Sequence, residues 1–172
     1  MSRNTQLSTL WCYSNQLTAL DVSQTQLTNL KCDDNQREIA VLNGTFNLAS
    51  LPGFDPARIK SVIGGALTSG TLTLYAGVTE VHYTYDCGRG KEKSVTLLPI
   101  RTLVLPDGVT RVESEAFSNV SAQGFLLPDG IAYIAPDAFP ADARLYYVEG
   151  TATAAYCDAH RGQLPKCLPY AP

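Results

Sequence analysis

Cysteine and histidine are the residues of this sequence whose spacing could support chemistry. Cys157 and His160 are one helical turn apart, and together with Cys167 they could supply three zinc ligands. The sequence offers no fourth ligand and no second Cys-x-x-Cys pair, so we expect no metal site there. A disulfide between Cys157 and Cys167 and a pair of free thiols both stay open.

Cys12 and Cys32 stand at equivalent positions of two similar stretches. If these stretches stack as successive strands, their backbones lie roughly 5 Å apart. Such neighbours could form a disulfide or share a metal ion. Thiols also pack as small hydrophobic groups, and a ladder of buried thiols is the favoured interpretation.

Catalytic patterns are absent from the sequence. A cysteine nucleophile needs a base within hydrogen-bonding reach, but His82 is expected on the polar face of a strand and His160 in the C-terminal segment. Asp33 and Asp34 are adjacent on an expected strand, so they point to opposite faces and cannot act as a paired acid and base. We therefore expect a protein that is not an enzyme and that needs no cofactor or metal.

Composition excludes several classes of function. Of 172 residues, 45% are hydrophobic and 17% charged, which is enough apolar matter for a core and too little charge for disorder. A net charge of -3 supplies no basic field, so we expect no binding of nucleic acid. No stretch of about 20 residues is continuously apolar, so we expect no membrane insertion.

The elements that must position these residues are two sets of repeats. Near the N-terminus, an apolar pattern ending in asparagine occurs twice, first as Leu7, Leu10, Cys12 and Asn15 and then as Leu27, Leu30, Cys32 and Asn35. This is the L-x-x-L-x-L-x-x-N pattern of a leucine-rich repeat. Its apolar positions point inward, and the Asn side chain can hydrogen-bond buried backbone groups where the chain turns.

A different repeat occupies the C-terminal part. The pattern of residues 103–117 recurs at 125–139, and a shortened third copy begins at Leu145. Each copy predicts a short strand, a Pro-Asp-Gly turn whose glycine tolerates positive φ, a second apolar step and a brief helical turn at Ala-Phe. The copies should stack as a right-handed coil.

These residues carry a resemblance to known families. The pattern L-P-D-G-V-x-x-V-x-x-x-A-F resembles the BspA-type leucine-rich repeat of bacterial surface proteins, and 17–23 is similar to internalin-like repeats of gut bacteria. The resemblance implies a secreted or cell-surface protein of a host-associated bacterium, used for adhesion or protein binding. The N-terminus shows no export signal, so the protein is cytosolic or its leader has been removed, and the repeats favour the second.

Residues 37–99 lack the repeats and show strand alternation instead. Val81, Tyr83 and Tyr85 share one face, and the turn after Tyr85 predicts that 79–86 and 92–98 pair as a hairpin. Further strands are expected at 38–42, 45–49 and 59–63. A module of this size has a marginal core, so we expect it to bury an edge or face against the flanking coils.

The predicted fold class is a β-rich repeat protein in which leucine-rich-repeat solenoid coils flank a small antiparallel β module. Residues 1–36 form a leucine-rich repeat fragment or cap. Residues 37–99 form the β module, and residues 100–172 form BspA-like coils with a C-terminal cap.

Two outward-facing sets are candidate binding residues. If Leu10 and Cys12 face inward, then Trp11 and Tyr13 face outward, with Lys31 and Asp33 beside them, as in an interaction hot spot. The alternative is that these residues cover the junction with the β module or another coil. The second set is an apolar ladder for which internal packing is favoured over a partner, made of Val104, Leu126 and Tyr146.

The expected function is non-catalytic protein binding or adhesion at a bacterial surface, with a host matrix or cell-surface protein as partner. One alternative is carbohydrate recognition by the β module, through Tyr75, Tyr83 or Tyr85. Because period-two burial makes Tyr83 and Tyr85 core residues, solvent-exposed tyrosines would be needed to support it. Another alternative is a structural spacer in a larger surface protein, with no ligand.

Overall fold

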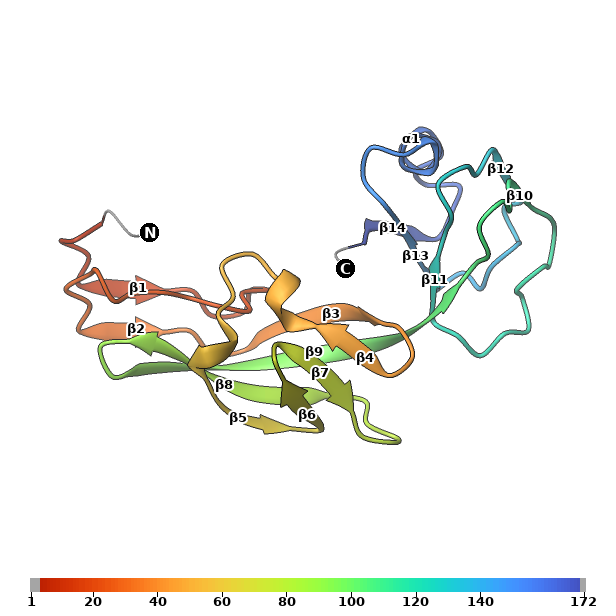
Figure 1. Cartoon of the computed structure of the whole chain (residues 1–172). Coiled ribbons are helices and arrows are strands. Elements are labelled where there is room, and N and C mark those ends of the chain that lie inside the picture. The colour runs from red at the N-terminus through yellow and green to blue at the C-terminus, as the bar shows by residue number, and fades with distance from the viewer. Residues whose placement is uncertain (1–3, 171–172) are drawn as a thin grey trace. The chain divides into compact units, whose positions relative to one another are not determined.

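The computed structural model describes residues 4–170 and is β-rich, with 40% of residues in strands and 8% in helices (Figure 1). The β-rich character predicted from the sequence is therefore confirmed. None of the helices in the described part of the chain has the length and apolar character needed to cross a bilayer.

Contacts divide the chain into two compact units. Unit 1 holds the described residues up to Ile39 together with Gly44–Pro99, and unit 2 holds Ala40–Asn43 together with the described residues from Ile100 onward. The strands and short 3-10 helices up to β9 are β1 (Thr9–Trp11), β2 (Asn29–Lys31), β3 (Asn35–Val41), β4 (Thr45–Asn47), η1 (Leu48–Ser50), η2 (Pro56–Arg58), β5 (Ile59–Ile63), β6 (Gly65–Thr68), β7 (Thr71–Leu74), β8 (Val81–Gly88) and β9 (Lys91–Val104). The later elements are β10 (Arg111–Val112), β11 (Gly124–Leu126), β12 (Tyr133–Ile134), β13 (Arg144–Tyr147), α1 (Ala152–Ala159) and β14 (Lys166–Pro169).

The N-terminal repeats of unit 1 pair in parallel. β1 and β2 lie side by side with Leu10 opposite Leu30, so the register reproduces the period of the sequence repeat (Figure 1). Both strands show the same burial pattern, in which the middle leucine is half-buried and its neighbours are exposed. The 20-residue period of the repeat therefore predicts which residues of the two strands lie opposite each other.

The pairings of β4 with β7, β5 with β8, β6 with β7 and β8 with β9 in the remainder of unit 1 are antiparallel. β8 and β9 form the predicted hairpin, with Val81 opposite Leu97 and Tyr83 opposite Val95. β5 pairs along the other side of β8, β3 pairs with β9, and β4, β7 and β6 form a separate sheet in that order. Period-two burial holds along β8, where Val81, Tyr83 and Tyr85 are all buried.

The repeat segment and the hairpin pack together within unit 1. The Tyr83 hydroxyl donates to the carbonyl of Thr18 at 2.6 Å, the Val22 N–H donates to the carbonyl of Cys87 at 2.9 Å, and Lys93 Nζ donates to the carbonyl of Leu17 at 2.5 Å. The β module thus buries one face against the N-terminal repeats, as the small size of its core predicts.

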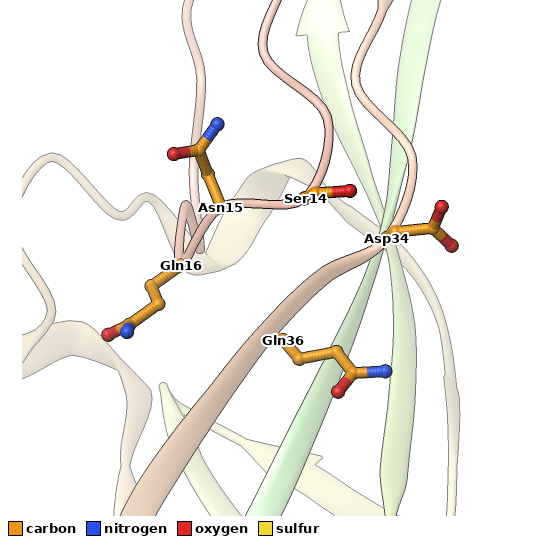
Figure 2. A pocket seen from close by; sticks show the side chains of 5 residues that line it. All are labelled: Ser14, Asn15, Gln16, Asp34 and Gln36. Carbon is orange, nitrogen blue, oxygen red and sulfur yellow. The ribbon is translucent and has the colours of Figure 1, made fainter.

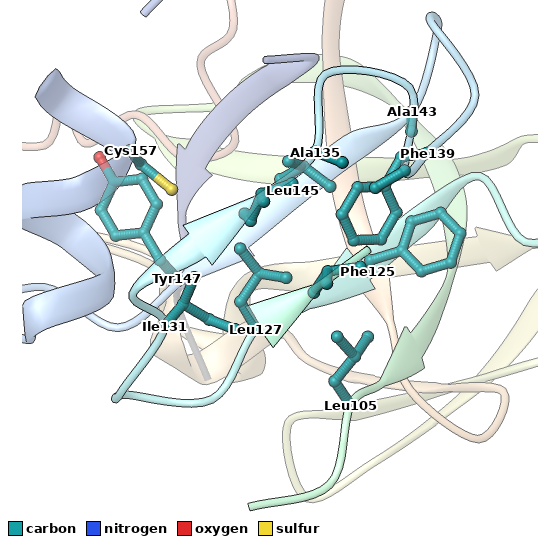
Figure 3. Packing of buried hydrophobic residues seen from close by; sticks show 13 residues of the cluster. Leu105, Phe125, Leu127, Ile131, Ala135, Phe139, Ala143, Leu145, Tyr147 and Cys157 are labelled. Carbon is teal, nitrogen blue, oxygen red and sulfur yellow. The ribbon is translucent and has the colours of Figure 1, made fainter. Parts of the chain in front are cut away.

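Unit 2 is a parallel stack formed by the last residues of β9, β11, β13 and β14. Phe125 lies opposite both Leu103 and Leu145, so the period of the C-terminal repeat is confirmed in the register of the first two strands. The core beneath these strands joins Phe125 to Phe117 and Phe139, with ring centroids 4.8 to 5.3 Å apart (Figure 3 labels Phe125 and Phe139). Aromatic pairs at this spacing add to the stabilisation from buried area.

The turns and cap of unit 2 depend on single residues. Gly108 has the positive φ expected of the Pro-Asp-Gly turn, 86°, whereas Gly130 at the equivalent position of the next copy does not. α1 begins after Thr151, whose side chain accepts from the N–H of Ala154. Thr153 in the first turn is buried and accepts from the N–H of Ile131 at 3.0 Å, which fixes the helix against the strands.

Candidate functional site

The outward side of β1 and β2 carries an aromatic ring and a cation in contact. Trp11 lies opposite Lys31, and Lys31 Nζ is 4.9 Å from the centroid of the Trp11 ring, a cation–π distance. The Trp11 side chain is nevertheless 60% exposed. We call Trp11, Tyr13, Lys31 and Asp33 the β1–β2 face.

Tyr13 and Asp33 extend this face beyond the strand ends. Tyr13 is 51% exposed and Asp33 is exposed, and the Ser14 N–H donates to the Asp33 carbonyl at 3.0 Å, which continues the parallel pairing. The structure therefore brings all four residues of the β1–β2 face to the outside of unit 1.

An open polar groove of about 530 Å³ lies where both strand segments end (Figure 2). Its lining residues are Ser14, Asn15, Gln16, Asp34 and Gln36. The sequence analysis did not single out these residues as a site. Ser14 and Asp34 have φ of 52° and 55°, so the same repeat position turns the chain in both copies, and that shared polar position was the available signal.

Asn35 holds the two repeat copies together. Its Oδ1 accepts from the N–H of Leu17 at 3.0 Å, and its Nδ2 donates to the carbonyls of Cys32 at 2.9 Å and Cys12 at 3.1 Å. The predicted role of the repeat asparagine is thus confirmed at Asn35. Asn15, its counterpart, is exposed and donates only to the carbonyl of Tyr13.

The second candidate set does not form an exposed stripe. Val104, Leu126 and Tyr146 lie in register on neighbouring strands, but their exposure falls from 51% at Val104 to 5% at Tyr146. The ring of Tyr146 packs so close to Gly124 that a Cβ at that glycine would lie 3.0 Å from it. The internal packing favoured from the sequence is what Tyr146 adopts.

Of the three tyrosines considered for carbohydrate recognition, two are buried and one is exposed. Tyr83 and Tyr85 are buried and pack against Phe54, with ring centroids 5.9 and 5.5 Å from it, so they are core residues. Tyr75 is 60% exposed. The exposed row of rings that would support sugar stacking is therefore not formed by these three residues.

Behind the β1–β2 face the Cys12 and Cys32 thiols pack together, as the favoured interpretation expected, and the buried amine of Lys93 is the residue here that the sequence analysis did not single out. The Cys12 thiol donates to Cys32 Sγ at 2.8 Å, and the Nζ of the buried Lys93 donates to the carbonyl of Leu17 at 2.5 Å. Burial raises the pKa of the Cys32 thiol to about 12, and it raises the pKa of the Cys87 thiol to about 12. Burial also lowers the pKa of Lys93. The signal was the alternation of β9, which puts Lys93 on the same face as Val95 and Leu97.

The remaining chemistry-bearing residues lie apart from one another. His82 is exposed, with Nδ1 3.1 Å from the Thr96 hydroxyl and Nε2 3.3 Å from a Glu80 carboxylate oxygen. His160 stacks on Tyr156 with ring centroids 4.0 Å apart, while Cys157 is fully buried in the core of unit 2. Across residues 4–170, no three histidine, cysteine or acidic side chains gather as a metal site.

The buried core of unit 2 reaches α1 through Cys157, which packs among the same side chains as Leu145 and Tyr147 (Figure 3).

Comparison with protein-family models, with curated proteins and with solved structures yields no match.

Proposed function

We propose that this protein is a non-catalytic binding module of a secreted or cell-surface bacterial protein, and that the β1–β2 face binds a protein partner. The observation that carries the proposal is the pair of exposed rings, Trp11 and Tyr13, beside Lys31 on two hydrogen-bonded strands. Tryptophan and tyrosine dominate the binding energy of protein interfaces. Clustered apolar surface of this kind is typical of a site that a partner covers.

We propose further that the parallel stacks are leucine-rich-repeat coils that flank the β module. The register of β1 with β2, and the register of β9 with β11, support this assignment because each matches the period of its repeat. The buried asparagine of the second copy supports it as well, because Asn35 hydrogen-bonds backbone groups of both copies.

The chemistry of the face indicates what a partner must offer. Trp11 and Tyr13 call for an apolar pocket, Lys31 for an acidic group and Asp33 for a basic one. Since the rings are held on paired strands, little chain entropy is lost on binding. A host matrix protein or cell-surface protein is the partner class that fits the proposed location.

Direct binding to immobilised extracellular matrix proteins and glycans tests the proposal. Wild type is compared with the double variant Trp11→Ala, Tyr13→Ala, and Tyr75→Ala is the matched control because Tyr75 is an equally exposed ring of unit 1. We expect saturable binding to a protein, weakened at least ~30-fold in the double variant, the effect of one or two hot-spot residues. Tyr75→Ala should bind as wild type does.

Two results would contradict the proposal. Glycan binding that survives in the double variant and is lost in Tyr75→Ala would move the site to the β module. Absence of binding across the panel, with both variants folded, would favour a structural spacer. Since Trp11 is the single tryptophan of the chain, a change in its fluorescence on binding gives an independent readout of the same face.

A further inference from the structure

Each unit holds two cysteines that pack in the same region of its core. In unit 1 the Sγ atoms of Cys12 and Cys32 are 2.8 Å apart. In unit 2 Cys157 of α1 belongs to the buried core cluster, and Cys167 of β14 packs against that cluster. In each pair one thiol is buried and its partner is half-buried, so each site has one sulfur that solvent can reach.

The backbone around the first pair has the spacing that a disulfide requires. The Cys12 N–H donates to the Lys31 carbonyl at 2.7 Å, and the Ser14 N–H donates to the Asp33 carbonyl at 3.0 Å, so parallel pairing continues on both sides of the cysteines. Parallel strands lie about 4.8 Å apart, and disulfides join Cα atoms about 4.4–6.8 Å apart. Asn35 fixes the spacing further because it hydrogen-bonds the carbonyls of both cysteines.

The second pair joins the C-terminal helix to the edge of the parallel stack. Cys157 is fully buried in the core of unit 2, and Cys167 lies opposite Leu145 in the register of β13 and β14. A covalent link here would tie α1 to β14.

We infer that the chain holds two disulfide-forming sites, Cys12–Cys32 in unit 1 and Cys157–Cys167 in unit 2, which are oxidised by a low-molecular-weight disulfide such as oxidised glutathione. Cys87, the fifth cysteine, stays a free thiol because its side chain is fully buried. This assignment accounts for the odd number of cysteines and does not depend on the proposed binding function.

Each site reacts in two exchange steps. The thiolate of the half-buried cysteine attacks one sulfur of the small disulfide, which forms a mixed disulfide and expels one small thiolate. The buried cysteine then loses its proton and attacks the protein sulfur of the mixed disulfide, which forms the protein disulfide and expels the second small thiolate. The two cysteine protons end on the two expelled thiolates, so the protein is oxidised by two electrons and the small disulfide is reduced to two thiols.

Peptide mapping of the full chain tests the assignment directly. Lys and Arg residues separate the five cysteines, so trypsin places each on a peptide of its own. Fully reduced protein is incubated with mixtures of reduced and oxidised glutathione, alkylated and digested without reduction. We expect two linked peptide pairs, Cys12 with Cys32 and Cys157 with Cys167, and a thiol count that falls from five to one.

Variants separate the two sites and supply controls. Cys87→Ser should retain both linked pairs and titrate to zero thiols, whereas Cys32→Ser should lose only the first pair. Oxidation should raise the Tm of unit 1 by roughly 12–24 °C in wild type and not in Cys32→Ser, as expected for a closed loop of this length in a unit of this size. A linked peptide containing Cys87, a covalent dimer, or an unchanged thiol count in wild type would overturn the assignment, and none of these readouts depends on a variant that fails to fold.

Discussion

Replacement of Asn35 by alanine should destabilise unit 1 far more than replacement of its repeat counterpart, Asn15. Asn35 is buried and bonds four backbone groups, the N–H of Leu17 and the carbonyls of Cys32, Cys12 and Asp33. Alanine would remove all four bonds in a place that excludes most water, and the Asp33 carbonyl would keep only its bond from the Ser14 N–H. Asn15 is exposed, and water can replace its single bond to the Tyr13 carbonyl.

The expected loss for Asn35→Ala is about 3 kcal/mol of the free energy of unfolding. An unsatisfied buried group costs about 1–3 kcal/mol, and we assign the larger share to the fully buried bond with the Cys32 carbonyl. The bonds to Leu17 and Cys12 are partly buried, so each contributes about 0.5–1 kcal/mol. Asn15→Ala should cost less than about 0.5 kcal/mol, as surface substitutions do.

Urea unfolding of the reduced protein measures both costs. Fluorescence of Trp11 reports on unit 1, and far-UV circular dichroism reports on the whole chain. Asn35→Asp is a useful third variant, because it keeps the acceptor for Leu17 but loses both donors and turns a carboxylate towards two carbonyls. Equal costs for Asn35→Ala and Asn15→Ala, or an Asn35→Asp variant as stable as wild type, would refute the reasoning.

Two further predictions concern the cores of the two units. In reduced protein the free energy of unfolding should fall as pH rises above about 8.5. The reason is that an unfolded thiol titrates near 8.5, whereas burial raises the pKa of Cys87 in the folded protein to about 12. The variant Cys87→Ala should make this fall shallower by about 1.4 kcal/mol per pH unit. Burial lowers the pKa of Lys93, which makes the free energy of unfolding rise with pH. This contribution is present in both wild type and Cys87→Ala, so it cancels when the two are compared. Identical slopes of the free energy of unfolding against pH in the two proteins, measured by urea unfolding, would contradict the prediction. In unit 2, Phe125→Ala should cost about 3–5 kcal/mol by circular dichroism, because the ring is fully buried and packs against both Phe117 and Phe139. Val104→Ala on the exposed side of the neighbouring strand should cost less than about 0.5 kcal/mol, and similar losses for the two variants would count against the core assignment.

Local periodicity made the strand pairing predictable. The N-terminal repeat puts Leu10 next to Leu30, and alternation along β8 buries Tyr83 and Tyr85, because both signals depend only on residues near in sequence. The outward position of Trp11 follows from the same alternation.

Tertiary packing decided what the sequence left open. The burial of Tyr146 depends on the missing side chain of Gly124, which lies on a different strand. Lys93 is buried because Leu17, far earlier in the chain, presents a carbonyl to its amine. No period in the sequence joins these residues, so the sequence alone did not single out Lys93 as a buried residue.

The two proposals meet on the same pair of strands. Trp11 and Cys12 are neighbours in sequence, as are Lys31 and Cys32, so the outward contact between ring and amine and the inward contact between thiols depend on one backbone spacing. A disulfide on the inward side would hold that spacing when the chain is strained, and it would leave the β1–β2 face ordered before a partner arrives. Ordering of the binding surface is part of the free-energy cost of association. A Cys12–Cys32 disulfide would therefore favour binding at the β1–β2 face without itself contacting the partner.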